Sequence, residues 1–276
     1  MSEKVWFITG CATGFGAALA QMALDRGERV VATDKDIDAL QHLRTLAPDK
    51  LLPLQLDVTQ PGDISVAVAK AITGYGRIDV LVNNAGLGYG GAFEEMDLAR
   101  NRLLFEVNIL GMMALTQQVL PHMRQAGRGH LINVSSDSGI YGQPFQTAYT
   151  ATKYAVEGFS EALSHELLMF GIKVTVIEPC GMFATAMPRD AVAEVERLAS
   201  PDSPYYPLVQ RALPGAKTNL ENALPPSTVA EAILEVATLE NPPLRRAVGL
   251  PERTGLLDLR RQMPDEDFIN LIRSHL

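Results

Sequence analysis

Short apolar runs alternate along the chain with longer segments whose apolar residues recur at helical spacing. Continuous apolar runs are typical of strands buried on both faces of a parallel sheet, and the longer period is typical of helices. The predicted strands are residues 5–9, 29–33, 51–56, 79–82, 130–134, 173–177 and 246–248. The predicted helices are residues 14–26, 37–46, 61–73, 98–124, 148–170 and 227–239. Because strands that alternate with helices form right-handed βαβ units, we expect one α/β domain with a doubly wound parallel sheet and helices on both faces.

One stretch, residues 182–226, departs from this alternation and is rich in proline. The prolines are Pro188, Pro201, Pro204, Pro207, Pro214, Pro225 and Pro226. We predict one or two short helices here, the clearest at residues 190–198. A long excursion from a compact domain usually carries function. We therefore expect residues 182–226 to be an insertion in the single domain that contacts the substrate.

Composition and charge argue against several classes of function. The 276-residue chain has a formal net charge of −8 at pH 7, whereas a nucleic-acid partner would require a basic face. Two cysteines, Cys11 and Cys180, are too few for a disulfide framework and fit a reducing compartment. The first predicted strand leaves no room for a signal peptide, and no apolar run approaches the ~20 residues of a membrane span. We therefore expect a cytoplasmic protein without a membrane or nucleic-acid partner. The five histidines are scattered, so no metal site is expected.

A glycine-rich turn follows the first predicted strand and opens the first predicted helix. Its sequence is Thr9-Gly10-Cys11-Ala12-Thr13-Gly14-Phe15-Gly16. Glycines keep such a turn tight, let the backbone approach a pyrophosphate and let the helix pack closely on the strand. The helix N-terminus offers free N–H groups and a partial positive charge to phosphates. The alternative is an ordinary glycine turn, but the place between strand and helix favours a dinucleotide site. The predicted contacts with the cofactor are Gly10, Thr13, Gly14, Phe15 and Gly16.

Asp34 and Lys35 stand at the end of the second predicted strand, ~20 residues beyond the turn. An acidic side chain at this point accepts hydrogen bonds from the adenine ribose hydroxyls and repels a 2′-phosphate. Lys35 is a counter-argument, because its ammonium could receive that phosphate. The turn carries no basic residue between Gly10 and Gly14. We therefore predict that NAD is favoured over NADP, with Asp34 and Lys35 both beside the cofactor.

Further motifs follow the later strands. They are Leu56-Asp57-Val58, Asn83-Asn84-Ala85-Gly86, and Tyr149 with Lys153 four residues on. Together with the glycine-rich turn, they make the chain resemble the classical short-chain dehydrogenases/reductases over essentially its whole length. The resemblance implies a Rossmann-type fold and a homodimer or homotetramer that pairs through two long helices. It also implies that the cofactor is contacted by Asp57, Val58, Asn84, Ala85 and Gly86.

Tyr149 and Lys153 lie four residues apart at the start of a predicted helix, which puts both side chains on one face. A free tyrosine has a pKa of ~10, too high for a good proton acceptor near neutral pH. A nearby ammonium favours the phenolate, so we expect Lys153 to lower the pKa of the Tyr149 phenol. In the family the lysine also holds the nicotinamide ribose. The alternative is an ordinary surface pair on a helix.

Two more residues complete the predicted catalytic set of Asn108, Ser136, Tyr149 and Lys153. Ser136 ends the fifth predicted strand, and a serine at this spacing from the tyrosine contacts the substrate oxygen in the family; Ser138 is the second choice. Asn108 lies inside a predicted helix, where asparagine is unfavourable. The family role of this asparagine is to hold a water in a proton relay through the lysine. The alternative is a polar kink in the helix.

The segment after the sixth predicted strand departs from the family pattern. The family usually has Pro-Gly here, with a threonine five residues past the proline. In this chain Cys180 follows Pro179, and Thr185 is six residues past the proline. We keep Pro179 and Thr185 as predicted cofactor contacts. Cys11 and Cys180 both fall on loops beside the cofactor, which suggests a thiol-dependent sensitivity to oxidation; the alternative is two small buried residues.

The predicted function is hydride transfer between a nicotinamide cofactor and an alcohol or ketone. Tyrosinate takes the hydroxyl proton while the carbon gives hydride to the nicotinamide, and reduction reverses this flow. An uncharged, fairly hydrophobic secondary alcohol or ketone is expected, although Arg189 could meet one carboxylate. This expectation comes from the side chains near the predicted pocket: Tyr89, Phe93, Tyr141, Phe145, Met182, Phe183, Met187, Tyr205 and Tyr206. The alternatives are a cofactor-binding sensor with little turnover, and an epimerase or dehydratase of the extended relatives.

Overall fold

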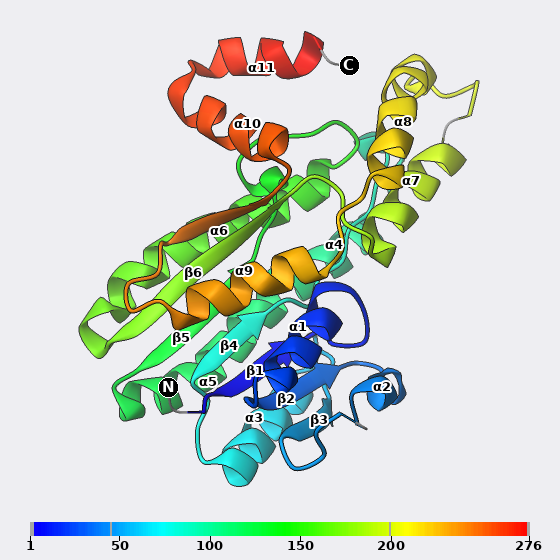
Figure 1. The fold of residues 1–276 in the computed structure, drawn as a ribbon. Helices are drawn as coiled ribbons and strands as arrows, with labels where there is room; N and C mark the ends of the chain where they lie inside the picture. The colour runs from blue at the N-terminus through cyan, green and yellow to red at the C-terminus, as the bar shows by residue number, and fades with distance from the viewer. Residues whose placement is uncertain (1–2, 45, 199, 275–276) are drawn as a thin grey trace.

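The computed structural model describes residues 3–44, 46–198 and 200–274 and has a seven-stranded parallel sheet at its centre (Figure 1). The strands lie in the order β3-β2-β1-β4-β5-β6-β7. Their bounds are Val5–Thr9 for β1, Arg29–Asp34 for β2, Leu51–Gln55 for β3, Val80–Asn83 for β4, Gly129–Val134 for β5, Ile172–Cys180 for β6 and Arg245–Gly249 for β7. This confirms the predicted doubly wound, Rossmann-type fold.

Helices cover both faces of the sheet, which explains why the strands are continuously apolar (Figure 1). Trp6 and Ile8 of β1 join one core with α1 (Gly14–Asp25) and α9 (Ser227–Thr238). Phe7, between them in sequence, joins the opposite core. That second core is completed by three helices: α3 (Pro61–Tyr75), α5 (Met112–Ala126) and α6 (Thr147–Leu167).

The order of the strands fixes where a ligand binds. The chain moves outward from β1 to β2 and β3, then returns to pair β4 on the other side of β1. Loops after β1 and β4 therefore diverge and leave a crevice at the carboxyl ends of these strands, where ligands bind in open α/β sheets. The glycine-rich turn follows β1 at this edge, and the motif that begins at Asn83 follows β4.

Three predicted helices differ from the observed ones. The helix predicted at 37–46 is only a 3-10 turn, Asp38–Leu40, followed by the short α2, Gln41–Arg44; residue 45 lies outside the described residues. The helix predicted at 98–124 contains a π-helical turn, Glu106–Gly111, between α4 (Leu98–Phe105) and α5. The helix predicted at 190–198 begins earlier, as α7 (Ala186–Leu198).

Three further helices were not predicted as such. In the insertion, α8 (Tyr206–Glu221) has Pro207 in its first turn, where no intrahelical N–H is required, and includes a second proline at Pro214. After β7 the chain forms α10 (Pro251–Gln262) and α11 (Asp265–Ser274). Figure 1 shows these two C-terminal helices at the same end of the molecule as α7 and α8.

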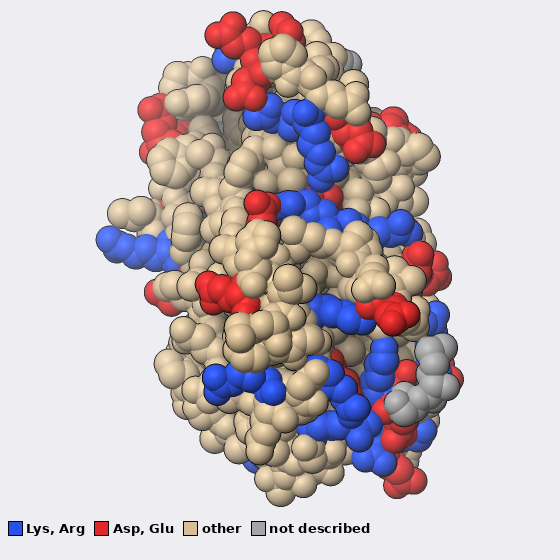
Figure 2. Space-filling view, turned by 90° about the vertical axis from the view of Figure 1, so that its left-hand side faces the viewer, with Lys and Arg blue, Asp and Glu red and all other residues tan. Residues whose placement is uncertain are grey.

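One helix is longer and more apolar than the sequence-based expectation allowed. The continuous helix Leu98–Ala126 is long and apolar enough to cross a membrane by length and composition, so the expectation that no segment approaches this length is wrong. In the structure, Leu115, Val119 and Met123 on this helix pack into the core against the sheet. Figure 2 shows Lys and Arg side chains interspersed with Asp and Glu over the face that it draws.

Candidate active site

The glycine-rich turn forms a cradle that only glycine can build. Gly10 has a φ of +72°, and a Cβ added at Gly16 would lie 2.1 Å from the Gly10 carbonyl oxygen. Asn84 Nδ2 donates hydrogen bonds to the carbonyl oxygens of Thr9 (2.7 Å) and Gly10 (3.1 Å) and so fixes the turn. In helix α1, all of which is described, the first turn has no acidic side chain and the Thr13 side chain makes no capping hydrogen bond. These features fit the phosphates of a dinucleotide.

The loop after β4 is joined to this turn. Thr9 Oγ1 accepts hydrogen bonds from the backbone N–H groups of Asn84 (3.0 Å) and Ala85 (2.9 Å). Gly86 follows, and a Cβ added there would lie 3.4 Å from Asn108 Oδ1. The structure therefore brings the predicted cofactor residues after β4 against those after β1.

The predicted adenine side of the site starts at the end of β2. Asp34 Oδ2 accepts a hydrogen bond from the backbone N–H of Ala12 at 2.9 Å, while Lys35 is exposed. Asp57 Oδ1 accepts hydrogen bonds from the N–H (2.9 Å) and hydroxyl (2.8 Å) of Thr59. Its neighbour Val58 is buried. The carboxylate of Asp34 is thus held beside the glycine-rich turn.

Asn108 lies in the π-helical turn, a feature that often marks functional sites. Its Oδ1 accepts a hydrogen bond from the N–H of Leu87 (2.8 Å), and its Nδ2 donates to the carbonyl oxygen of Leu87 (2.9 Å) and to Thr152 Oγ1 (3.1 Å). Thr152 is on α6, one residue before Lys153. The asparagine therefore joins the loop after β4 to the helix that carries Tyr149. Its role in a proton relay stays a prediction.

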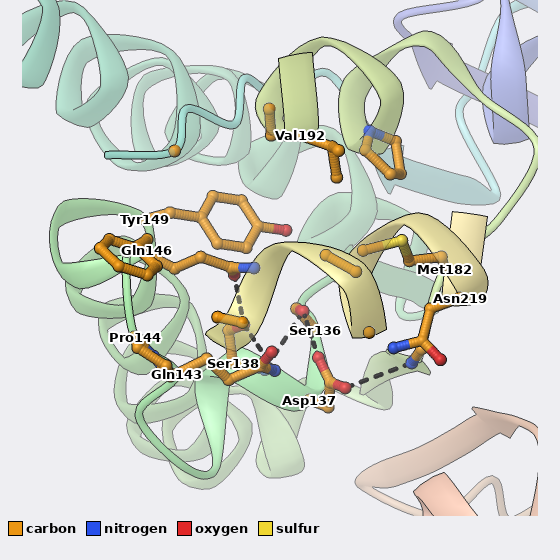
Figure 3. Close-up of a pocket in the computed structure, with 18 of the residues that line it drawn as sticks. Ser136, Asp137, Ser138, Gln143, Pro144, Gln146, Tyr149, Met182, Val192 and Asn219 are labelled. Atoms are coloured by element: carbon orange, nitrogen blue, oxygen red, sulfur yellow. Dashed lines mark hydrogen bonds between the residues drawn. The ribbon is translucent and has the colours of Figure 1, made fainter. Parts of the chain in front are cut away.

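Lys153 and Tyr149 meet at the end of β5. Lys153 Nζ donates a hydrogen bond to the Val134 carbonyl oxygen at 2.9 Å and lies 5.5 Å from the Tyr149 ring centroid. Burial lowers the pKa of the Lys153 ammonium to about 8, and the charge of Glu157 opposes this shift. Ser136 is also buried, and Figure 3 shows it among the side chains that line one cavity together with Tyr149. The structure therefore brings the predicted catalytic residues together.

The pKa of the Tyr149 phenol is raised in this structure and not lowered, as had been expected from the neighbouring Lys153. Burial raises the pKa of the Tyr149 phenol above its ordinary value; a hydrogen bond with Ser136 opposes this, and the charge of Asp137 adds to it. The Lys153 ammonium gives its hydrogen bond to the backbone instead. Spacing along a helix does not reveal how deeply the phenol is buried, which decides the sign of the shift.

The cavity beside Ser136 and Tyr149 has a volume of about 610 Å³. Its walls come from the loops after β4, β5 and β6 and from α6, α7, α8, α10 and α11. Of the side chains expected to line it, five do so: Tyr89, Tyr141, Phe145, Met182 and Met187.

Other residues expected at the cavity lie elsewhere. Phe183 is buried and packs edge-to-face on Phe15, with ring centroids 5.1 Å apart. Phe93 is 55% exposed, and Arg189 is exposed beside Asp190. Tyr205 and Tyr206 are not among the lining residues that the structure describes.

The sequence analysis missed several lining residues. Asp137, directly after Ser136, is one; the others include Arg253 and Leu256 on α10 and Leu271 and Ile272 on α11. Helix α10 is held in place by an ion pair between Arg261 and the buried Glu178 of β6, with an N–O distance of 3.3 Å. The proline at the start of α10 and the acidic first turn of α11 were the available signals for these two helices.

The segment after β6 lies beside both the substrate cavity and the glycine-rich turn. Pro179 is within β6, paired in register with Val248 of β7. Thr185 lies against the glycine-rich turn, because a Cβ added at Gly14 would be 3.2 Å from Thr185 Cγ2. Despite the apparent one-residue insertion, Thr185 is thus beside the predicted phosphate site. Contact of Pro179 and Thr185 with the cofactor stays a prediction.

Both cysteines are fully buried, with no exposed surface. Burial raises the pKa of both thiols, that of Cys180 to about 12. A thiol reacts as the thiolate, so these groups are poor targets for oxidants. The structure favours the alternative that Cys11 and Cys180 are small buried residues.

Comparison with known proteins agrees with the site. Residues 4–196 match the family model described as short chain dehydrogenase. The chain is 37% identical over 246 residues to the uncharacterized oxidoreductase YusZ of Bacillus subtilis, with 87% of each chain covered. It is 35% identical to 3-ketodihydrosphingosine reductase of Bacteroides thetaiotaomicron (90% of this chain, 89% of that one). It is 37% identical to retinol dehydrogenase 8 of Bos taurus (95% and 86%).

Solved structures extend the likeness to the whole fold. A short-chain dehydrogenase from Streptomyces avermitilis is 37% identical, with a TM-score of 0.81 and coverage of 95% of this chain and 94% of that one. A family member from Burkholderia phymatum, solved in complex with NAD, is 25% identical with a TM-score of 0.78 and the same coverage. The chain belongs to the short-chain dehydrogenase family. It is an NAD(P)-dependent oxidoreductase, and a sensor without turnover is not favoured.

Proposed function

We propose that this protein oxidises or reduces large, uncharged, apolar secondary alcohols and ketones, with a preference for NAD. The observation that carries the proposal is the cavity of about 610 Å³ that opens on Ser136 and Tyr149. Its far walls are mainly apolar and include Met187, Val192 and Leu256. A cavity of this size and lining suits a drug-sized apolar molecule held by few polar contacts.

Charge in the cavity supports an uncharged substrate. Its described lining has two acidic and two basic side chains: Asp137, Glu252, Arg211 and Arg253. The positive charge of Arg253 lowers the pKa of Asp137 against the effect of burial. Arg253 also lowers the pKa of the Tyr141 phenol against the effect of burial. Because the charges of Asp137 and Arg253 already compensate each other, a charged substrate would have to separate them.

In the proposed reaction, Ser136 and Tyr149 contact the substrate oxygen. The bound nicotinamide supplies the hydride donor or acceptor. Because burial raises the pKa of the Tyr149 phenol, the structure favours the protonated form, which gives a proton to the carbonyl oxygen during reduction. In oxidation the same phenol must first lose its proton. Lys153, held by Val134, places a positive charge near the ring that favours this loss.

The preference for NAD rests on Asp34. The hydrogen bond from Ala12 holds the Asp34 carboxylate at the glycine-rich turn, where it would accept from ribose hydroxyls and repel a 2′-phosphate. A hydrogen bond to a charged group contributes about 1.5–3 kcal/mol, so Asp34→Ala should reduce the NAD/NADP ratio of kcat/KM by tenfold or more, at about 1.4 kcal/mol per tenfold.

The names of two relatives support a large apolar substrate. One is called 3-ketodihydrosphingosine reductase and another retinol dehydrogenase 8. We therefore include ketones with long alkyl chains among the candidate substrates and, beyond the secondary alcohols, the primary alcohol retinol. Retention of two buried free thiols supports the further proposal that the enzyme is cytoplasmic.

We also propose that subunits pair through α4–α5 and α6. Exposed apolar side chains on these helices include Phe105, Leu110 and Tyr154, which are 39%, 49% and 43% exposed. Apolar side chains gathered on a helix face favour association of identical subunits.

The proposed substrate class is tested with a series of alkan-2-ols from butan-2-ol to decan-2-ol, with NAD and NADP, by following NADH or NADPH absorbance. Each added methylene contributes ~0.8 kcal/mol of burial, so kcat/KM should rise about fourfold per methylene. Retinol is assayed alongside, and 3-hydroxybutyrate is the charged control. A kcat/KM that does not change with chain length, or that is highest for 3-hydroxybutyrate, contradicts the proposal.

A further inference from the structure

One face of helix α6 carries a row of ionisable side chains. Tyr149, Lys153, Glu157 and Glu161 follow one another at four-residue spacing, so each lies about one turn beyond the last. The first two belong to the predicted catalytic set. Glu157, directly beyond them, is 5% exposed and has no part in the proposed reaction. A buried carboxylate is unfavourable unless other groups compensate it, so the neighbours of Glu157 indicate what it does.

The carboxylate of Glu157 is anchored by a cation from the sheet. Arg245, the first residue of β7, donates a hydrogen bond from Nε to Glu157 Oε2 at 2.9 Å. The same arginine donates from Nη2 to Glu161 at 2.5 Å, and its Nε lies 3.8 Å from Glu178 Oε1. Arg261 of α10 pairs with Glu178 in turn. Three carboxylates therefore share two arginines, which leaves negative charge beside this face of α6.

The side chain of Glu157 is enclosed by the loop after β5. A Cβ added at Gly139 would lie 2.6 Å from Ser135 Oγ, 3.1 Å from Glu157 Cγ and 3.1 Å from the Lys153 carbonyl oxygen. Glu157 Oε1 is buried and makes no hydrogen bond of normal geometry with any residue that the structure describes. Ser135 directly follows Val134, whose carbonyl oxygen accepts the hydrogen bond of the Lys153 ammonium. Glu157 and the ammonium therefore lie against the same end of β5.

Lys153 is a buried cation between a phenol and a carboxylate on its own helix. The Tyr149 ring centroid lies 5.5 Å from the ammonium, and Glu157 is one turn away in the other direction. Asp137, after β5, acts on Tyr149. Burial lowers the pKa of Lys153 to about 8, and Glu157 is the carboxylate whose charge opposes this shift. The row on α6 thus places a counter-charge next to the lysine.

We propose that Glu157 is a positioning residue for the reaction: its carboxylate, anchored by Arg245, keeps the buried Lys153 ammonium protonated beside Tyr149. An isolated ammonium in an apolar place would lose its proton instead of remaining charged. Glu157 supplies the opposite charge without contacting the substrate, and it leaves the ammonium bonded to Val134. The inference rests on the proposed function, because there the charge of Lys153 favours loss of the Tyr149 proton.

The charged groups that face Glu157 come from four elements. They are Lys153 and Glu161 on α6, Arg245 on β7, Glu178 on β6 and Arg261 on α10. Burial raises the pKa of the Glu157 carboxyl, while Ser135, Arg245 and Arg261 lower it. Burial also raises the pKa of Glu178 to about 7, and the charge of Glu157 adds to this. Because Glu178 titrates near neutral pH, the test has to read the charge of Lys153 itself.

The charge of Lys153 is read by ¹³C NMR of protein labelled at lysine Cε, with the signal assigned by its loss in Lys153→Met. In Glu157→Gln the pKa of Lys153 should fall from about 8 to about 7 or lower, since a close opposite charge changes a pKa by about one or more. Glu157→Asp keeps the charge and should keep most of the wild-type pKa. A pKa that is unchanged in Glu157→Gln, or that falls as far in Glu157→Asp, overturns the inference.

Glu161→Gln is the matched control. It removes a carboxylate that pairs with the same Arg245 but lies one turn farther from Lys153 and is half exposed. The pKa of Lys153 should therefore stay near 8 in this variant. If it fell as far as in Glu157→Gln, loss of the ion pairs of Arg245 would be the cause, and the inference would be wrong.

A second measurement needs no Glu157 variant. If Glu157 favours the charged form of Lys153, then Lys153 favours the charged form of Glu157 by the same amount. The carboxyl carbon of Glu157, titrated by ¹³C NMR, should therefore show a higher pKa in Lys153→Met than in the wild type. The same pKa in both proteins overturns the inference, even where Glu157→Gln does not fold.

The pH profile connects this charge to the reaction. Loss of the Lys153 charge disfavours the tyrosinate needed for oxidation, so kcat/KM for decan-2-ol with NAD should decline at a lower pH in Glu157→Gln than in the wild type. In Glu161→Gln the decline should not move. A decline that stays in place while the pKa of Lys153 falls overturns the role of Glu157 in the reaction. If the wild type oxidises no alkanol, the proposed substrate class fails, whereas the two NMR titrations still decide the inference.

Discussion

The Lys153 ammonium donates a hydrogen bond to the Val134 carbonyl oxygen at 2.9 Å, which joins helix α6 to the carboxyl end of strand β5. The same ammonium is buried, and this lowers its pKa from 10.5 to about 8. At neutral pH the folded protein therefore keeps a positive charge in a place that disfavours it. The position next to Tyr149 explains why such a charge is useful in spite of its effect on stability.

Lys153→Met should stabilise the protein while it abolishes turnover. The difference between a pKa of 10.5 and one of about 8 corresponds to about 3 kcal/mol, from which the lost hydrogen bond subtracts about 1 kcal/mol. We expect the free energy of unfolding at pH 7 to rise by about 2 kcal/mol in urea titrations. Because the folded pKa is the lower one, the wild type should gain stability as the pH rises from about 8 to 10.5, and the variant should not. A destabilised variant would contradict the assignment of a buried ammonium.

Gly16→Ala should disrupt the cofactor cradle. The added Cβ would lie 2.1 Å from the Gly10 carbonyl oxygen and 2.6 Å from Asn84 Nδ2, so the turn must move. We expect the Kd for NADH, measured by fluorescence, to rise at least tenfold, since a displaced turn loses hydrogen bonds to the phosphates. Gly62→Ala in helix α3 is the matched control, because an added Cβ there meets nothing within 4 Å. Equal affinities for the two variants would show that the cradle does not bind the cofactor.

His130 should make the protein sensitive to acid. It is 5% exposed, its Nε2 lies 2.9 Å from Thr175 Oγ1, and burial lowers its pKa to about 3. Because the folded pKa is below the unfolded value of ~6.5, this residue's contribution to stability is present above pH 6.5 and is lost as the pH falls towards 3. We expect a loss of about 2 kcal/mol at pH 5, measured against His130→Gln in urea titrations.

Glu178→Gln is the matching control, because this residue should change the stability of the protein with pH in the opposite direction to His130. Burial raises the pKa of Glu178 to about 7, so the wild type gains stability from this group as the pH falls from about 7 to 4.5, and the variant does not. If the His130→Gln and Glu178→Gln variants followed the wild-type pH dependence, burial would not control these groups.

Leu110→Asp should separate the subunits of the proposed dimer. The side chain is 49% exposed on the helix expected to form the interface, and a carboxylate buried between subunits is strongly unfavourable. We expect sedimentation velocity to show a monomer for this variant and an oligomer for the wild type. Val66→Asp, at an equally exposed apolar position on α3, should leave the oligomer intact. A monomeric wild type would end this proposal.

The sequence predicted those parts of the molecule whose signal is local. Strands buried on both faces are continuous apolar runs, as Val5–Thr9 is. The four-residue spacing of Tyr149 and Lys153 predicts that both side chains lie on one face of a helix. The glycine-rich turn was readable because Gly16 has to be small against the Gly10 carbonyl group. These features depend on a few neighbouring residues, so pattern and spacing were sufficient.

The rest depends on packing between distant segments. Helices α10 and α11 are largely polar, and they become the wall of the cavity only because residues such as Leu257 and Phe268 meet Tyr141 across the molecule. Burial raises the pKa of both Tyr149 and Asp137. The cavity beside these two side chains is likewise closed by those helices and by α7 and α8. In the sequence, the only sign of the π-helical turn was Asn108, a residue that is unfavourable inside a helical pattern.

The central claim is that Tyr149 transfers the proton while the cofactor transfers hydride. Tyr149→Phe removes only the phenolic oxygen and leaves the ring beside Lys153. Proton transfer by a positioned side chain contributes ~10²–10⁴-fold, so kcat for decan-2-one reduction by NADH should fall by at least a hundredfold. The Kd for NADH should change less than threefold, within about 0.7 kcal/mol. A Tyr149→Phe variant that keeps wild-type kcat with decan-2-one would contradict the account.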